Sequence, residues 1–280
     1  YTASLIVNNG LLNSQAKTVS ITANSTAILF YDNFSTGDLS HTQNGFGWNG
    51  AWIDTADPLD IKPTVTEIFK HNGNNSCRFQ FAGSLDLTDD SRSELRYILG
   101  YPMNEVYMQW YMYYPDGTEN PSLGAKWQHR SPPTGGNNNK FYKLWADSYS
   151  NYTVATGIST WPNATLHDTY FVEFGSNNTK IGVGSWGKDV DSSGTDARLG
   201  KWLKIQIHTK CATVANNDGI IEMWIDDVLV LSSTDLDMYP VNGIGNYLRN
   251  GYIMGWMNSG FNQTSSVFIA DVKISQNFIP

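Results

Sequence analysis

The feature that most limits the fold of this chain is a long series of short apolar segments in which large and polar side chains alternate. Examples are "CRFQFAG", "SELRYIL", "EVYMQWYMYYP", "WLKIQIHTK" and "SVFIADVKIS", separated by stretches rich in Gly, Asn, Asp and Ser. Alternation with a period of two is typical of strands that bury one face, and no segment has the period of an amphipathic helix. We therefore predict an all-β fold, built as a sandwich of two antiparallel sheets.

The domain organisation follows from where these segments begin. Residues 29–280 are enough for one large sandwich with a single core. Residues 1–28 contain "SLIVNNGLL" and "KTVSITA", which indicate a hairpin around an Asn-Gly turn. This hairpin is either the trailing part of an immunoglobulin-like or PKD-like module or an extension packed on the main domain.

Composition excludes several partners. The formal net charge is −8 and only 16% of residues are charged, so we expect no binding to nucleic acid. No apolar run approaches the ~18 residues that span a bilayer, so we expect no membrane insertion.

Cys77 and Cys211 are too few for a disulfide scaffold, and the sequence leaves open whether they pair with each other. Several Asn-X-Ser/Thr sequons weakly favour an extracellular protein, or one associated with a virion or cell surface.

The stretch "DDSRSELRY", Asp89–Tyr97, is the most unusual strand candidate. In an extended chain Arg92, Glu94 and Arg96 share one face, while Leu95 and Tyr97 share the other. The charged face is either a solvent-exposed ladder of ion pairs, which adds little stability, or a polar floor for a charged ligand.

Four segments together resemble a known family: "FYDNFSTGDL", "SRSELRY", "GKWLKIQIHTK" with "NDGIIEMWIDDVLV", and the closing "VFIADVKIS". Their order resembles the concanavalin A-like jelly-roll polysaccharide lyases, which include alginate, glucuronan and heparin lyases. The resemblance spans about residues 29–280 and implies a jelly roll of the lectin and glucanase type. It also implies cleavage of an acidic, uronate-containing polysaccharide by β-elimination, with no cofactor required for catalysis.

The family's alginate lyases place Gln and His together on a strand that lines the cleft. A literal "QIH" occurs at Gln206–His208, within "WLKIQIHTK". The positional counterpart is "AKWQHRS", Ala125–Ser131, beside a loop rich in Gly and Asn. We expect the second of these segments to supply the site, with His129 as the base.

β-Elimination requires a group that neutralises the uronate carboxylate, a base for the C5 proton and an acid for the leaving oxygen. Arginine, histidine, lysine and tyrosine suit these tasks, and basic and aromatic side chains bind a polyanion. The predicted catalytic residues are His129, Arg92, Tyr142 and Lys143. The predicted substrate-binding residues are Glu94, Arg96, Gln109, Tyr111, Lys126, Gln128, Arg130 and Tyr149.

The strand "EVYMQWYMYYP" carries the aromatic part of this prediction. Gln109 and Tyr111 share one face, which can stack on sugar rings, whereas Trp110 and Met112 share the other and are expected in the core. The alternative is that the whole strand belongs to the core.

Two other functions are possible for this fold: hydrolysis of a glycosidic bond and carbohydrate binding without catalysis. Glycoside hydrolases need two carboxylates that flank the scissile bond. The strand Glu-x-Asp-x-x-Glu of the lectin-like glucanases is absent, and Asp226 and Asp227 in "EMWIDD" are expected at a hairpin turn. A noncatalytic lectin-like carbohydrate-binding or adhesion module is the main alternative, because it would keep the fold without the chemistry.

A structural calcium ion is the one metal that we expect. Asp32 in "DNFSTGD" and Asp271 in "IADVKIS" come together if the first and last strands of the sandwich pair. Carboxylate oxygens are the ligands that Ca²⁺ prefers. The alternative is that both are ordinary turn carboxylates.

Overall fold

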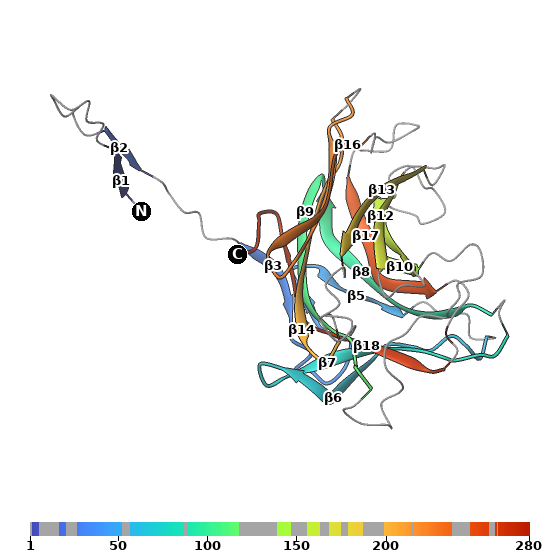
Figure 1. The fold of residues 1–280 in the computed structure, drawn as a ribbon. Coiled ribbons are helices and arrows are strands. Elements are labelled where there is room, and N and C mark those ends of the chain that lie inside the picture. Colours follow the sequence, from blue (N-terminus) through green and yellow to red (C-terminus); the bar gives the residue numbers. More distant parts are fainter. Residues whose placement is uncertain are drawn as a thin grey trace, which may run out of the picture.

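Two antiparallel sheets face each other across one apolar interior (Figure 1). The computed structural model describes residues 2–5, 17–20, 27–51, 57–86, 89–117, 139–146, 156–162, 168–174, 179–186, 199–213, 216–236, 247–257, 261 and 263–280. None of these residues lies in a helix, and so none forms a helix able to cross a bilayer. The predicted all-β, two-sheet antiparallel sandwich is confirmed.

The first sheet, which we call the β8 sheet, has eight strands. In spatial order they are β13 (Thr179–Trp186), β12 (Asp168–Phe174), β11 (Thr156–Pro162), β10 (Asn139–Trp145), β17 (Leu248–Met257), β8 (Ser91–Met103), β5 (Phe46–Ala51) and β4 (Thr42–Gln43). Strands β10, β17 and β8 lie side by side at its centre although they are far apart in the sequence.

The second sheet, the β9 sheet, closes the sandwich from the other side. In spatial order its strands are β16 (Val228–Leu236), β15 (Gly219–Ile225), β14 (Trp202–Lys210), β9 (Glu105–Tyr113), β18 (Ser265–Ser275), β7 (Asn74–Phe81) and β6 (Thr64–His71). Strand β3 (Ile28–Asp32) also pairs with β18, so the first and last strands of the sandwich are neighbours, as expected.

The interior forms because each central strand turns its apolar face inward. On β9, Trp110 and Met112 are fully buried, which confirms their prediction as core residues. The ring centroid of Trp110 lies 5.8 Å from that of Phe141 and 6.2 Å from that of Tyr142, both on β10 of the facing sheet. These aromatic contacts tie the two sheets together.

The N-terminal strands stand apart from the sandwich. β1 (Thr2–Leu5) and β2 (Lys17–Ser20) pair only with each other among the described strands, as a two-stranded antiparallel sheet. Figure 1 shows this hairpin away from the two large sheets. A hairpin in residues 1–28 is therefore present, whereas its origin in an immunoglobulin-like or PKD-like module is not confirmed.

The structure also bears on one predicted turn and on the two cysteines. Asp226 and Asp227 form the turn between β15 and β16, with φ values of 48° and 67°, as expected. Cys77 and Cys211 are both buried and unbonded to each other. Burial raises the pKa of the Cys211 thiol to about 12 and also raises that of Cys77, so neither thiol is activated.

Candidate functional site

The charged strand at the centre of the β8 sheet presents its polar side chains away from the core. Leu95 and Tyr97 belong to the apolar interior, and the alternation of β8 therefore directs Arg92, Glu94 and Arg96 outward. This confirms the predicted division of the strand. We call the outward side of this sheet the β8 outer face.

The register of the two neighbouring strands adds further side chains to this face. Tyr252 on β17 is the partner of both Arg96 on β8 and Lys143 on β10. Lys143, Tyr252 and Arg96 therefore form a row across three adjacent strands, which are about 4.8 Å apart. In the same way, Trp256 on β17 is the partner of Arg92.

Two of the three side chains in the row are almost completely buried, and Arg96 is partly exposed. Tyr252 is 1% exposed and Lys143 is 4% exposed, although neither belongs to the apolar core cluster. Trp145 packs beside the row, with its ring centroid 5.7 Å from that of Tyr252 and 5.8 Å from the guanidinium carbon of Arg96. Burying charged groups without need is costly, so this arrangement is an unusual use of a sheet surface.

Glu94 orients the arginine of the row. The Nε of Arg96 donates to Oε1 of Glu94 at 2.6 Å. Burial raises the pKa of the Glu94 carboxyl, and the hydrogen bond from Arg96 together with the charges of Arg96 and Arg92 opposes that rise. The side chain of Arg96 keeps 21% of its surface exposed, so it reaches solvent while Glu94 holds one edge of it.

Arg92 lies between an acid and an aromatic ring. Its Nη1 is 3.3 Å from Oδ2 of Asp60, and its guanidinium carbon is 3.8 Å from the ring centroid of Trp256. The backbone amide of Ile61 donates to the carbonyl of Arg92 at 2.9 Å and fixes the segment that carries Asp60. The indole Nε1 of Trp256 donates to Oδ2 of Asp90 at 2.6 Å.

The structure brings together some of the predicted residues. Arg92, Glu94, Arg96 and Lys143 all lie on the β8 outer face. Another group lies outside the described residues, and its roles stay predictions: Lys126, Gln128, His129, Arg130 and Tyr149.

Tyr142 is placed on the other side of the β8 sheet. It is 1% exposed and lies in the interior, with its hydroxyl 3.4 Å from Oγ1 of Thr209 on the facing sheet. Burial raises the pKa of its phenol. A β-bulge at Lys140 and Tyr142 explains this position, because it lets two successive aromatic residues of β10 turn inward.

Gln109 and Tyr111 lie on the outer face of the β9 sheet. The alternation of β9 confirms that they share one face, opposite Trp110. The literal "QIH" lies on the same surface, with Gln206 the register partner of Gln109. None of these residues joins Arg92 and Arg96, because the two outer faces are on opposite sides of the sandwich.

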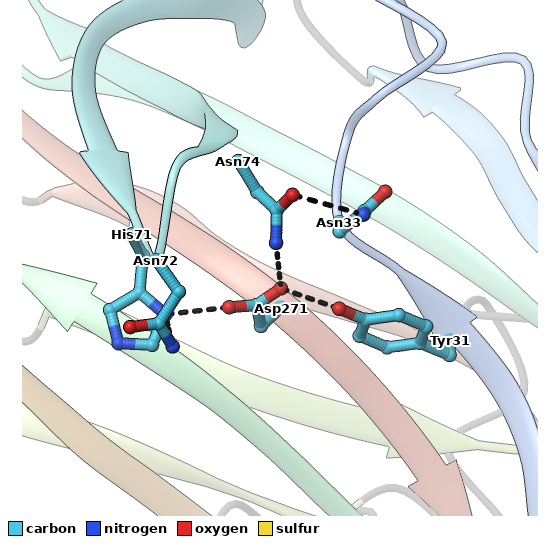
Figure 2. Close-up of polar contacts among 6 residues, drawn as sticks. All are labelled: Tyr31, Asn33, His71, Asn72, Asn74 and Asp271. Carbon is cyan, nitrogen blue, oxygen red and sulfur yellow. Dashed lines mark hydrogen bonds and ion pairs between the residues drawn. The ribbon is translucent and has the colours of Figure 1, made fainter.

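The two predicted calcium ligands have separate protein partners. Oδ1 of Asp271 accepts from the hydroxyl of Tyr31 at 2.8 Å and from Asn74 at 3.3 Å, and its Oδ2 lies 2.6 Å from Nδ1 of His71 (Figure 2). Asp32 accepts from the amide of Phe34 and from the indole of Trp48. Within the described residues, no three His, Cys, Asp or Glu side chains are grouped to hold a metal. The calcium ion stays a prediction.

Four residues of the site were missed by sequence reasoning: Asp60, Trp145, Tyr252 and Trp256. The segment "GYIMGWM" offered a signal, since its aromatic residues are spaced for one face of a strand. The sequence does not show that this segment pairs with β8, because β8 and β17 are far apart along the chain.

Comparison with solved structures supports the fold. The alginate lyase vAL-1 from Chlorella virus superimposes with a TM-score of 0.56 at 10% identity, covering 90% of this chain and 100% of that one. The endo-β-1,4-glucuronan lyase of the fungus Trichoderma reesei gives 0.56 at 13% identity, covering 90% and 97%. The marine PL-14 alginate lyase of Aplysia kurodai gives 0.55 at 11% identity, covering 90% and 100%. At these identities the likeness shows a shared jelly-roll fold.

Sequence comparison identifies the family. No curated protein sequence matches the chain. A family model described as polysaccharide lyase matches residues 34–273, which include β8, β10 and β17 and therefore the whole row described above. The chain belongs to the polysaccharide lyase family.

Proposed function

We propose that this polysaccharide lyase cleaves a uronate-containing polysaccharide by β-elimination and that the substrate binds across the β8 outer face. The observation that carries the proposal is the row of Lys143, Tyr252 and Arg96, whose members are adjacent in register. It supplies a cation, a basic side chain and a phenol in one place, which are the groups that this elimination requires.

Arg96 is suited to neutralise the substrate carboxylate. The C5 proton of a uronate becomes acidic enough to remove only when the neighbouring carboxylate is stabilised as charge develops on it. Arg96 has its Nε on Glu94 and part of its side chain exposed, which leaves the guanidinium oriented for a two-pronged contact. Glu94 acts as its positioning residue.

Lys143 and Tyr252 are suited to the two proton transfers. We assign Lys143 as the base that takes the C5 proton, as an amine, and Tyr252 as the acid. The electron pair of the C5–H bond forms the C4=C5 double bond, the C4–O bond breaks, and the departing oxygen receives the phenolic proton of Tyr252. Tyr252 then regains a proton from solvent, and Lys143 returns its proton to solvent.

Arg96 is the cation that suits an acidic substrate. Its side chain keeps 21% of its surface exposed, whereas Arg92 lies against Asp60 and is almost completely buried. A partly exposed guanidinium binds a carboxylate well. An extracellular, virion or cell-surface location belongs to this proposal, because acidic structural polysaccharides lie outside the cytoplasm.

The test is a panel of alginate, glucuronan, pectate, ulvan and glycosaminoglycans, followed by the ultraviolet absorbance of the unsaturated uronate. Lys143→Ala and His129→Ala are compared on the best substrate, with Lys204→Ala as a matched control. Lys204 is a half-buried lysine on the outer face of the other sheet, paired with Asp227 at 2.6 Å. Loss of turnover in Lys143→Ala alone supports Lys143 as the base, whereas loss in His129→Ala alone returns that role to His129.

A further inference from the structure

Four side chains form a continuous chain of contacts at one end of the β8 outer face. Asp60 pairs with Arg92 at 3.3 Å, Arg92 stacks on the Trp256 ring at 3.8 Å, and the Trp256 indole donates to Asp90 at 2.6 Å. The flat guanidinium supports the flat ring, and the hydrogen bond stops the ring from rotating. The orientation of Trp256 is therefore fixed from two sides.

The two arginines of β8 differ in how they meet solvent. Arg92 is 4% exposed and lies between Asp60 and Trp256, whereas the side chain of Arg96 is 21% exposed. The exposed part of Arg96 can meet a substrate carboxylate directly. The carboxylate could reach Arg92 only by displacing Trp256 or Asp60, which makes a direct contact with Arg92 unfavourable.

Trp256, unlike Arg92, is exposed to solvent. It is 37% exposed, and a tryptophan so exposed and yet so firmly held is uncommon on a sheet surface. A rigid aromatic ring loses little conformational entropy when a ligand stacks on it, which is why such rings are common binding anchors.

The spacing places Trp256 at a distance from the reacting groups. Trp256 and Tyr252 are on the same strand and face the same side, and four residues of strand extend about 13 Å. A sugar on Trp256 is therefore a different unit of the polymer from the one that meets Tyr252. Contacts with such a remote unit supply binding energy without taking part in proton transfer.

We propose that Trp256 is a sugar-stacking platform of the polysaccharide site and that Arg92 is the positioning residue that holds this platform. This inference rests on the proposed function, in that the β8 outer face binds the polymer. It assigns Arg92 a role through Trp256 rather than a contact with the substrate carboxylate.

A double-mutant cycle tests the inference. The variants are Trp256→Ala, Arg92→Lys and the double variant, with Trp224→Ala as a control for loss of a tryptophan on the other sheet. Arg92→Lys keeps a charge beside Asp60, which avoids leaving a buried acid unpaired, but removes the planar support of the ring. KM and kcat are measured on the best acidic polysaccharide, and melting temperature verifies folding.

We expect Trp256→Ala to raise KM about tenfold with a smaller change in kcat, as for loss of a binding anchor. Arg92→Lys should raise KM in the same direction, and the double variant should be no worse than Trp256→Ala alone, because both act through one ring. If the effects of the two single variants multiply in the double variant, or if Trp256→Ala leaves KM unchanged, the inference is wrong.

Direct binding separates this inference from the proposed function. Tryptophan fluorescence is titrated with alginate and glucuronan tetrasaccharides in the wild type and in Trp256→Phe, with cellotetraose as a neutral probe. A signal that the wild type gives and Trp256→Phe loses supports the platform even if no polysaccharide is cleaved. Identical titrations in the two proteins overturn the platform even if the wild type is an active lyase.

Discussion

Lys143 and Arg96 are both register partners of Tyr252, one on each side of it. They come from strands β10 and β8, which are separated in the sequence by β9 and in space by β17. A basic side chain and a carboxylate-binding side chain therefore flank one phenol. Lys143 and Tyr252 are buried in this row, whereas Arg96 keeps part of its side chain exposed to solvent.

Arg96→Gln should lower kcat by about 10²–10³-fold, because the lost cation acts mainly on charge that develops during proton removal. KM should change less. Arg78→Gln is the matched control, since Arg78 is a half-buried arginine on β7 of the other sheet that donates to Ser266 at 3.0 Å. An equal loss in both variants would point to a general effect on folding instead.

Tyr252→Phe should lower kcat by about 10²–10⁴-fold with little change in melting temperature, because only the proton-donating hydroxyl is removed. Tyr142→Phe should keep most of the turnover, since that hydroxyl faces Thr209 in the interior. Steady-state kinetics of the two variants distinguish the two tyrosines. Loss of turnover in Tyr142→Phe but not in Tyr252→Phe would make Tyr142 the catalytic tyrosine, as the sequence predicted.

Gly255→Ala should impair both stability and turnover. Gly255 has a φ of +155°, and a Cβ there would lie 3.2 Å from Cε2 of Tyr252 and 3.5 Å from Oε2 of Glu94. The matched control is Gly73→Ala, at a φ of +83° with no atom within 4 Å, which measures the backbone effect alone. Each should lose about 1–2 kcal/mol of stability from the backbone, and only Gly255→Ala should also lose turnover. Equal turnover in the two variants would show that Gly255 is not needed for the site.

Tyr31 should link stability to alkaline pH. Burial, followed by the hydrogen bond to Asp271 and the charge of that residue, raises the pKa of Tyr31 from 10.0 to about 12. The folded state then holds the phenolic proton more tightly than the unfolded chain, so this stabilisation is complete below pH 10 and is lost as the pH rises toward 12. The difference in melting temperature between the wild type and Tyr31→Phe should therefore shrink across this range. A difference that stays constant would contradict the raised pKa.

Local patterns predicted much of the fold but not the positions of the sheets. Alternation on β8 placed Arg92, Glu94 and Arg96 correctly on one face, and alternation on β9 placed Trp110 in the core. The same pattern could not show that β9 belongs to the opposite sheet, because the choice of sheet depends on pairing between distant segments. Gln109 and Tyr111 were therefore grouped with a face that they do not join.

Bulges account for the remaining differences. The irregular register of β10 at Lys140 and Tyr142 turns Tyr142 inward and leaves Lys143 on the outer face. A strict alternation read from the sequence cannot reveal an extra residue of this kind. The pairing of β17 with both β8 and β10 brings the row together. This pairing joins segments that are distant in the sequence, so the sequence alone did not predict it.

The most direct test of the account is the ultraviolet absorbance of the unsaturated product, measured over time for the wild type, Lys143→Ala and Lys204→Ala on the panel of acidic polysaccharides. We expect absorbance to rise with at least one uronate polymer in the wild type and in Lys204→Ala, and to remain flat in a folded Lys143→Ala. A wild type that produces no unsaturated uronate from any of these polymers, or a Lys143→Ala variant as active as the wild type, would contradict the central claim.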